Sequence, residues 1–316
     1  MHLRRPLVAT VTLNPSLDEW VYLRTLRPGE LHRSTGFARY PGGKGINVSR
    51  AIRELGGRTV ALGFAGGEDG MILRHAMRRL GLPHQLVTIP GSTRNNYKIR
   101  TESPRALTEI NTAGPRVPAA AQRELARRLF AVHPQPRAVA LSGSLPPGVP
   151  QTIYERWIRA WQRQGVPVLL DASGEALRVG LRAKPWSIKP NRQEAEEVLG
   201  RRLTGRAALV RAVQDLRRGG VEVVILSLGA DGALMGCATG VWRATPPSVE
   251  VDSAVGAGDS LVGGFLIGWM ATGSLTDAFR YGVASGAAAA MTPGTELCHR
   301  RDVLRLLRRV KIRRLV

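Results

Sequence analysis

The chain has 316 residues and a mass of 34.2 kDa, with 43% hydrophobic and 22% charged residues. A chain of this size can bury a sizeable core, and its composition excludes collagen and a disordered chain. A disulfide scaffold is also excluded, because Cys237 and Cys298 are the only cysteines. The formal net charge of +22 would suit a polyanionic partner, but the arginines are scattered along polar helix faces, which favours a basic soluble protein without a specific nucleic-acid partner.

Short β-branched runs alternate with helical patterns along most of the chain. The N-terminus lacks the apolar stretch and cleavage site of a signal peptide and is predicted to enter a first strand. The alternation predicts a mostly parallel sheet with helices on both faces. The predicted strands are 7–13, 59–64, 138–141, 166–171, 186–189 and 221–228, and the helices between them are 46–55, 70–80, 119–132, 151–164, 191–199 and 206–218.

Two stretches, 19–40 and 85–111, break this alternation with aromatic and β-branched residues but no helical period. They are predicted to form short antiparallel strands in a discontinuous lid over the carboxyl ends of the sheet.

The last part of the chain is predicted to be helical, with small-residue helices at 257–271 and 276–291 and an amphipathic, basic helix at 300–316. The most apolar run, 261–271, falls short of the roughly 20 residues that a membrane span needs, so we expect a buried helix and no membrane partner.

The strongest local signal is the segment 253–260, which reads SAVGAGDS and precedes an apolar helix. Gly256 and Gly258 allow a tight turn, and the helix start offers unpaired N–H groups to an anion. The carboxylate of Asp259 inside such a hole would repel phosphate, so its presence there indicates a chemical role, such as accepting a proton from an attacking hydroxyl. The plainer alternative is a glycine-rich turn with Asp259 as a helix cap.

Five further blocks accompany this segment in a fixed order: TLNPSLD at 12–18, PGGKGINV at 41–48, LSGSLPPG at 141–148, KPNRQE at 189–194 and SLGADG at 227–232. Together they resemble the ribokinase-like, or phosphofructokinase B, carbohydrate kinases over about residues 7–307. The resemblance implies a three-layer α/β/α sandwich with a mostly parallel central sheet and a small β-sheet lid. It also implies a single kinase domain over 1–316, with the lid at 19–40 and 85–111.

Within that family the chain is most similar to 1-phosphofructokinases and tagatose-6-phosphate kinases, through Lys44 in the Gly-Gly-Lys-Gly block and through TRNNYK at 93–98. A phosphorylated sugar needs a cationic pocket, in which Lys44 would supply a point charge and Arg94 a planar fork. The implied reaction is ATP-dependent phosphorylation of fructose 1-phosphate on its 6-hydroxyl to fructose 1,6-bisphosphate. Side-chain types leave 6-phosphofructokinase and tagatose-6-phosphate kinase open, and the charge leaves a nucleic-acid-binding protein on a kinase scaffold as an alternative of another class.

The resemblance implies roles residue by residue. Asp259 would be the catalytic base, inside an anion hole formed by Gly256, Ala257 and Gly258. Asn191 and Glu194 would hold Mg²⁺ through water, a role compatible with a helix-capping pair. The expected substrate-binding residues are Asp18, Gly42, Gly43, Lys44, Asn47, Arg94, Lys98 and Ser144, and the expected nucleotide-binding residues are Lys189, Asn191, Glu194, Ser227, Gly229, Gly232, Val283 and Ala287.

The implied cofactors are ATP and Mg²⁺. Ser253 and Ala254 stand where many relatives have Asp-Thr, in a region that also binds a monovalent cation in that family. The loss of both side chains puts potassium activation in doubt, although backbone carbonyls could still bind the ion. Because a lid presents strand edges, a homodimer through the lid is expected. Two isolated thiols favour a reducing cytoplasm.

Overall fold

A computed structural model describes residues 6–316. Its main sheet has ten strands in the order β14-β13-β12-β11-β10-β9-β8-β1-β4-β5, and the strands from β11 to β5 in this order are parallel. The bounds are β1 Leu7–Thr12, β4 Arg58–Ala65, β5 His84–Thr88, β8 Ala138–Ser142, β9 Val168–Asp171, β10 Ser187–Ile188, β11 Val223–Ser227, β12 Ala233–Cys237, β13 Gly240–Thr245 and β14 Lys311–Arg314.

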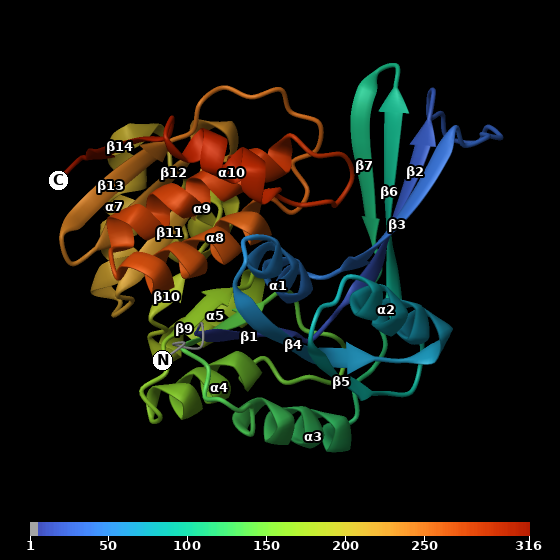
Figure 1. Cartoon of the computed structure of the whole chain (residues 1–316), viewed down its shortest axis with the longest axis horizontal. Helices are drawn as coiled ribbons and strands as arrows, with labels where there is room; N and C mark the ends of the chain where they lie inside the picture. Colours follow the sequence, from blue (N-terminus) through green and yellow to red (C-terminus); the bar gives the residue numbers. More distant parts are fainter. Residues whose placement is uncertain (1–5) are drawn as a thin grey trace.

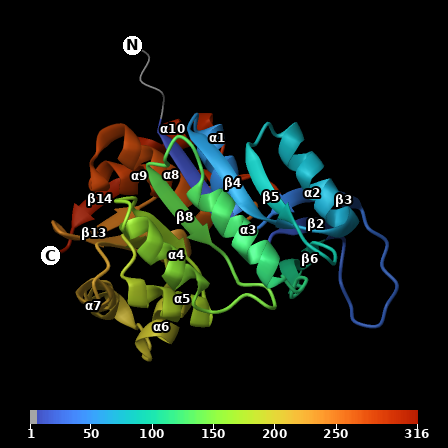
Figure 2. The ribbon, with the colours of Figure 1, turned by 90° about the horizontal axis from the view of Figure 1, so that it is seen from below.

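Helices cover both faces of this sheet, which confirms the three-layer prediction (Figures 1 and 2). Along β1, Leu7, Ala9 and Val11 pack into one core cluster, whereas Val8 packs into the other, as the two-residue period of a strand requires. The first cluster receives α3 Ala119–Phe130, α4 Ile153–Gln162, α5 Gly174–Gly180, α6 Arg192–Leu199 and α7 Gly205–Arg218; the second receives α1 Lys44–Glu54, α8 Ala257–Thr272, α9 Leu275–Ala290 and α10 Arg300–Leu307. A third, smaller cluster lies under α2 Gly67–Arg79.

The predicted pair of small-residue helices is confirmed as α8 and α9, and their glycines explain the close packing. A Cβ atom on Gly264 would lie 2.2 Å from Ser285 Oγ, and one on Gly268 would lie 2.9 Å from Ala278 Cα. No helix within residues 6–316 is long and apolar enough to cross a membrane.

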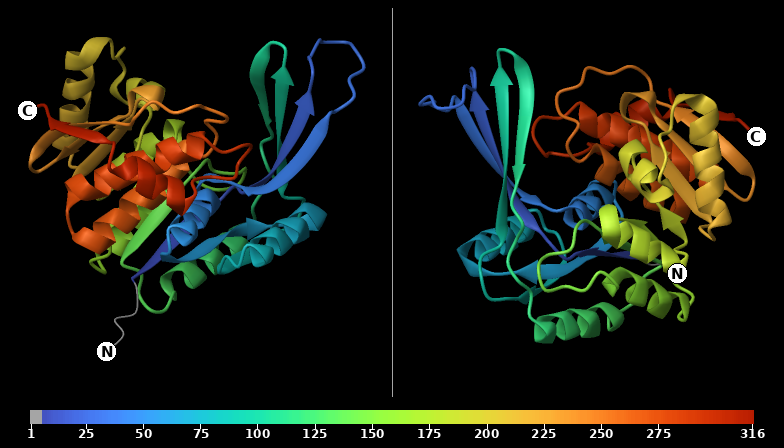
Figure 3. Two further views of the ribbon diagram at one scale, coloured as in Figure 1. Left: turned by 45° about the horizontal axis from the view of Figure 1, so that its top comes forward. Right: turned by 180° about the vertical axis from the view of Figure 1, so that it is seen from behind.

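A second sheet projects from the body as a lid (Figures 1 and 3). It contains β2 Ser16–Leu23, β3 Gly36–Gly42, β6 Arg94–Glu102 and β7 Arg105–Asn111 in the order β3-β2-β6-β7. The predicted bounds need correction, because residues 84–88 form β5, which pairs with β4 in the main sheet and buries Leu86 and Val87 in two core clusters. The lid is also not purely antiparallel, since β2 and β6 pair in parallel.

The predicted C-terminal helix over 300–316 is wrong beyond α10, which ends at Leu307. Val310 is buried in the turn after α10, and Ile312 packs against the second cluster from β14, which pairs antiparallel with β13. The hairpin β12–β13 was also not predicted. These three strands complete the sheet at one edge with antiparallel pairing.

The strand order places a topological switch point between β1 and β8. From β1 the chain proceeds outward to β4 and β5, whereas β8 to β11 extend in the opposite direction. The loops that leave the carboxyl ends of β1 and β8 therefore diverge, and open α/β sheets bind their ligands at such a point.

Candidate active site

At this edge of the sheet, the first turn of α8 has the backbone form that the predicted anion hole requires. Gly256 caps the helix with φ of +79°, and a Cβ atom there would lie 2.3 Å from Leu297 Cδ2, so the turn requires glycine. The Ser260 N–H bonds back to Gly256 O at 2.8 Å, and no side chain caps the helix. By position, the amides of Gly258 and Asp259 lack an acceptor inside the helix and are available to an anion.

Asp259 is buried, and Asn47 Nδ2 donates a hydrogen bond of 2.9 Å to its Oδ2. Burial and the nearby charge of Asp171 raise the pKa of Asp259 to about 6, although Lys44, Asn47 and Lys189 act in the opposite direction. A carboxyl group with a pKa close to neutral can accept and release a proton at working pH, as a general base must.

Arg50, which was not predicted, holds Asn47 in position. Its Nη1 donates to Asn47 Oδ1 and to Pro41 O, both at 3.2 Å, and its Nη2 donates to Thr295 O at 2.7 Å. With its oxygen held by Arg50, the Asn47 amide must present its NH₂ group to Asp259. Arg50 therefore sets the direction of the hydrogen bond from Asn47 to Asp259.

Asp171, also missed, ends β9 between two ammonium groups. Its Oδ1 lies 3.1 Å from Lys44 Nζ and 3.4 Å from Lys189 Nζ. Burial opposes ionisation, but the two cations together lower the pKa of Asp171. Burial likewise opposes the charge on Lys44, but Asp171, Glu194 and Asp259 together raise its pKa. A polar residue at the carboxyl end of a predicted buried strand is the signal that could have identified Asp171.

Two carboxylate oxygens beside this cluster fit a hydrated magnesium ion. Asn191 and Glu194 form a capping box at the start of α6, in which each side chain accepts the other's backbone N–H, at 2.8 and 2.9 Å. This leaves Glu194 Oε1 facing Lys44 Nζ at 3.8 Å, while Asp171 Oδ2 is buried without a hydrogen-bond partner within residues 6–316. Carboxylate oxygens and retained waters suit Mg²⁺. Asn191 fits less well, because its Oδ1 is used in the cap.

A second group of polar residues lies where β1 passes into the lid. Ser16 Oγ donates to Asp18 Oδ1 at 3.0 Å, and Asn96 Nδ2 donates to Ser16 Oγ at 3.0 Å and to Asp18 Oδ1 at 3.4 Å. Gly42 is required here, because a Cβ atom would lie 2.4 Å from Asp18 Oδ1. Gly43, at φ of +107°, then starts α1. These contacts fix Asp18 as an acceptor beside the switch point.

Arg94 and Asn14 complete this group. Arg94 donates from Nε and Nη2 to Asn14 O, at 3.2 and 3.0 Å, and from Nη1 to Thr112 O at 2.8 Å. Two of its five N–H groups therefore have no acceptor in the part of the chain that the structure describes. Asn14 Nδ2 reaches Ser144 Oγ at 3.3 Å, whereas its own Oδ1 is buried without a partner in the described chain. Unsatisfied buried oxygens of this kind are ready to bind the hydroxyl groups of a ligand.

The family model described as "pfkB family carbohydrate kinase" matches residues 11–301. The chain belongs to the pfkB family of carbohydrate kinases. It is 38% identical over 309 residues to a 1-phosphofructokinase of Bacillus subtilis, covering 98% of this chain and 100% of that one, and 34% identical to a 1-phosphofructokinase of Escherichia coli, covering 96% and 97%. The crystal structure of phosphofructokinase-2 from Escherichia coli in complex with potassium matches with a TM-score of 0.90 at 33% identity, covering 96% and 99%.

The family confirms the ribokinase-like fold and an ATP-dependent carbohydrate kinase activity. Within this kinase the two cations predicted to share one phosphate have no common partner. Lys44 lies with Asp171 and Glu194, whereas Arg94 lies with Asn14 and Thr112. The structure therefore gives no shared contact that would support a single pocket for both cations within residues 6–316.

The remaining predicted residues of the kinase have local roles in the structure. Lys98 is buried on the lid and neutralised by Glu109 at 2.8 Å. Gly232 is required by the turn before β12, since a Cβ atom would lie 2.1 Å from Ala244 O. Val283 of α9 is buried in the second core cluster. Ser227 Oγ donates to Pro190 O at 3.4 Å, Gly229 adopts φ of +62°, and Ala287 packs at the margin of the second cluster. Their contact with a nucleotide stays a prediction.

The lid of the kinase is attached to the body at loops beside the anion hole. Arg100 Nη1 donates to Asp252 O at 2.7 Å and forms an ion pair with the Asp252 carboxylate. Trp20 Nε1 donates to Thr295 Oγ1 at 2.9 Å. The lid, the loop before Ser253 and the loop that holds Arg50 are thus connected by hydrogen bonds.

Proposed function

We propose that this kinase phosphorylates fructose 1-phosphate on its 6-hydroxyl, with MgATP, to give fructose 1,6-bisphosphate. Two relatives at 34–38% identity, each aligned over at least 96% of this chain, are 1-phosphofructokinases. The observation that carries the proposal is the buried Asp259 in the first turn of α8, with Asn47 directed at it and two lysines nearby.

The sugar would lie over the polar group that Asp18, Asn14 and Asn96 form. Asp18 and the unpartnered Asn14 Oδ1 and Asn96 Oδ1 would accept hydrogen bonds from its hydroxyls. The two free N–H groups of Arg94 would bind the phosphate that the sugar already carries.

In the transfer step, the sugar O6 attacks the γ-phosphorus, the bond from that phosphorus to the bridging oxygen of ADP breaks, and the O6 proton passes to an Asp259 oxygen. The amides of Gly258 and Asp259 would bind the equatorial oxygens. Lys44 and Lys189, held by Asp171, would offset charge as it develops. We therefore assign Lys44 to the moving phosphoryl group rather than to the sugar phosphate.

Glu194 and Asp171 would hold a magnesium ion through water, and when bound it neutralises phosphate charge.

The monovalent-cation site that many relatives build with an Asp-Thr pair has Ser253 and Ala254 in this chain. Ser253 Oγ accepts a hydrogen bond from the Val255 N–H at 3.2 Å within its own loop, so its side chain does not replace the missing carboxylate. We therefore expect that replacing potassium by choline in the assay buffer changes the rate of phosphorylation little. Both cysteines are free and buried, in keeping with a cytoplasmic enzyme.

The test is a coupled initial-rate assay with MgATP that compares fructose 1-phosphate, fructose 6-phosphate and tagatose 6-phosphate. We expect the highest kcat/KM for fructose 1-phosphate. A preference for either 6-phosphate would assign the kinase to that substrate instead. If only an unphosphorylated sugar were turned over, the proposed binding of a sugar phosphate by Arg94 would be wrong.

We also propose that the lid pairs with a second copy of the chain. The strand register places Val21 beside Phe37 and Ile99, and Tyr97 beside Ile110, on the lid face opposite Asp18. Phe37 is 58% exposed and Ile110 50%, so this face leaves apolar area uncovered. The double substitution Phe37→Glu with Ile110→Glu places charge on this face and should separate the two chains. The molar mass of the protein in solution, measured by light scattering, should then fall by half.

The matched control for the lid is Leu304→Glu on α10, which changes an equally apolar residue that is 41% exposed. It should leave the mass at twice the 34.2 kDa of one chain. A wild-type mass of one chain would contradict the lid dimer.

A further inference from the structure

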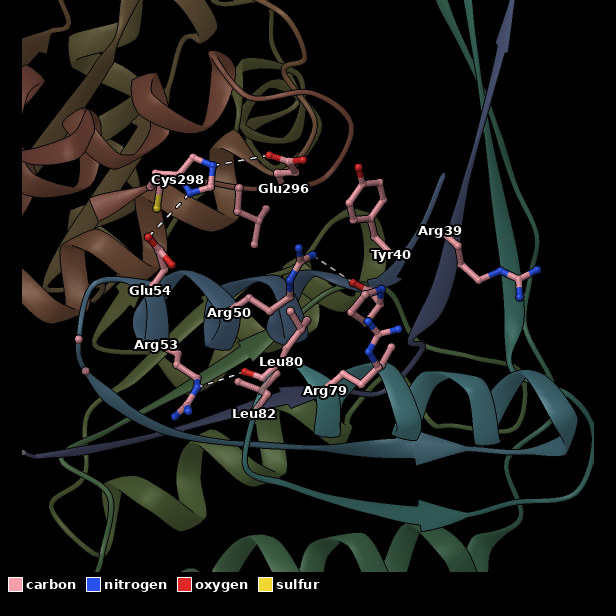
Figure 4. Close-up of a pocket in the computed structure, with 16 residues that line it drawn as sticks. Arg39, Tyr40, Arg50, Arg53, Glu54, Arg79, Leu80, Leu82, Glu296 and Cys298 are labelled. Atoms are coloured by element: carbon pink, nitrogen blue, oxygen red, sulfur yellow. Dashed lines mark hydrogen bonds and ion pairs between the residues drawn. The ribbon is translucent and has the colours of Figure 1, made fainter. Parts of the chain in front are cut away.

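A cavity of about 870 Å³ is lined by residues of α1, of the end of α2 and of the segment from Glu296 to His299, and Asp259 does not line it (Figure 4). We name it the α1–α2 cavity. Its walls come from β3, α1, the end of α2 and the segment from Glu296 to His299, and include Arg50, Arg53, Arg79, Tyr40, Leu80 and Leu297. Its volume lies within the roughly 300–1,000 Å³ of small-molecule sites.

The charge of the α1–α2 cavity is unbalanced. Four arginines line it, against Glu54 and Glu296, and both glutamates flank His299, at 3.8 and 3.6 Å. Arg39 has a partner in Glu19 and points away from the centre (Figure 4). The other three arginines have no carboxylate within ion-pair distance in residues 6–316, so a net positive potential remains.

Two of these arginines have donors to spare. Arg79 forms no hydrogen bond or ion pair within the described chain, and Arg50 uses three of its five N–H groups on Asn47, Pro41 and Thr295. In Figure 4 both side chains extend toward the space beside Tyr40. Two guanidinium groups that converge on one space match the oxygens of a phosphate group.

The remaining wall is apolar. Leu80, Leu82, Leu297 and the ring of Tyr40 line the cavity together with the arginines. An inorganic ion would leave this wall uncovered, whereas a larger molecule with a phosphate at one end would cover it. We propose that the α1–α2 cavity is a second binding site, distinct from the active site, for a small organic molecule that carries a phosphate group.

Such a ligand would act on the base through Arg50. A phosphate that draws the guanidinium away from Asn47 Oδ1 weakens the hydrogen bond from Asn47 to Asp259, which favours protonation of the base. The other groups that face Asp259 are Asp171, Lys44 and Lys189, and none of them lines the cavity. The ligand should therefore inhibit, more strongly at acid pH. This effect rests on the proposed function, whereas the binding does not.

The experiment measures binding to the full-length protein by calorimetry, with inorganic phosphate, AMP and glucose 6-phosphate as probes. The variant Arg79→Glu reverses one unpaired charge of the cavity. Its matched control is Arg78→Glu, the neighbouring exposed arginine of α2, which does not line the cavity. Arg94→Ala reports on the active site. The unfolding temperature of each variant checks the fold.

We expect at least one organic probe to bind more tightly than inorganic phosphate, with an affinity that falls about tenfold or more in Arg79→Glu and less than about twofold in Arg78→Glu and Arg94→Ala. AMP and glucose 6-phosphate distinguish a nucleotide from a sugar phosphate as the source. Equal losses in Arg78→Glu and Arg79→Glu would indicate attraction to overall charge and overturn the proposal. Loss of all binding in Arg94→Ala would place the probes in the active site and would overturn the proposal. Absence of binding to the wild-type protein would overturn it as well.

Discussion

The two ends of the candidate site are built differently. At the phosphoryl end, the buried Asp171 pairs with the buried Lys189 and the half-buried Lys44, which lie at the ends of main-sheet strands and on α1. At the sugar end, Arg94 is held by backbone carbonyls, and the side-chain oxygens of Asn14 and Asn96 have no partner among residues 6–316.

This difference separates two tasks. Charges that already have a partner of opposite sign are pre-organised and need little rearrangement when a phosphoryl group arrives. Polar atoms without partners at the sugar end become satisfied only when a ligand binds, so that end selects the substrate. Changes at the first end should alter kcat, and changes at the second end should alter KM.

The largest effect should come from Asp259→Asn. The variant retains the shape of the side chain but cannot accept the O6 proton, so kcat should fall by roughly 10²–10⁴-fold. Steady-state rates, with the unfolding temperature as a check on the fold, measure this. A loss of less than about tenfold in a folded variant would exclude Asp259 as the base.

Lys44→Met should come next. It removes one of the two cations on Asp171 Oδ1, and we expect kcat to fall by roughly 10²-fold while KM for the sugar phosphate stays within about twofold. Lys311→Met, on exposed β14, is the control for loss of a lysine. A rise in KM without loss of kcat would return Lys44 to the sugar-phosphate pocket.

Arg94→Ala should show the opposite pattern. A charge-assisted hydrogen bond contributes about 1.5–3 kcal/mol, so KM for the sugar phosphate should rise by roughly 10–100-fold with kcat little changed. Arg94→Lys retains the charge without the planar fork and should give an intermediate KM. If kcat fell and KM did not change, the division between the two ends would fail.

The smallest effect is a shift in pH dependence. The base must be ionised, so kcat/KM should decline as the pH falls through about 6, the raised pKa of Asp259. Asn47→Ala removes a hydrogen bond that stabilises the carboxylate, so this acid limb should move to higher pH, by up to about one unit, since one unit corresponds to about 1.36 kcal/mol. A limb that stays in place or moves to lower pH would contradict the role of Asn47.

The elements that sequence reasoning predicted correctly are those with strong local patterns. The apolar runs of β1 and β11 and the glycine-rich start of α8 carry their own signals. The short strands β5 and β12 do not, because each has only five residues, β5 with mixed polarity and β12 with small residues, and the strand that lies beside such a run decides its structure.

The same distinction applies to the site. Asp259 and Asn47 lie in recognisable sequence blocks at the starts of α8 and α1, but they meet across 212 positions of sequence. Arg50 reaches Thr295 O across 245 positions. In the sequence Arg50 is one arginine among many, and only the three-dimensional fold distinguishes it from the surface arginines.

The terminal strand β14 has a consequence for the behaviour of the protein in solution. An unpaired strand edge offers a row of N–H and C=O groups to other molecules, and natural sheets protect such edges with charge. Here the edge reads Lys-Ile-Arg-Arg, and three of its four side chains are exposed cations. Two such edges should repel each other, so we expect β14 to oppose the joining of two sheets through this edge. A chain that ended after α10 would expose β13, which carries one arginine and a tryptophan, and would lose this protection.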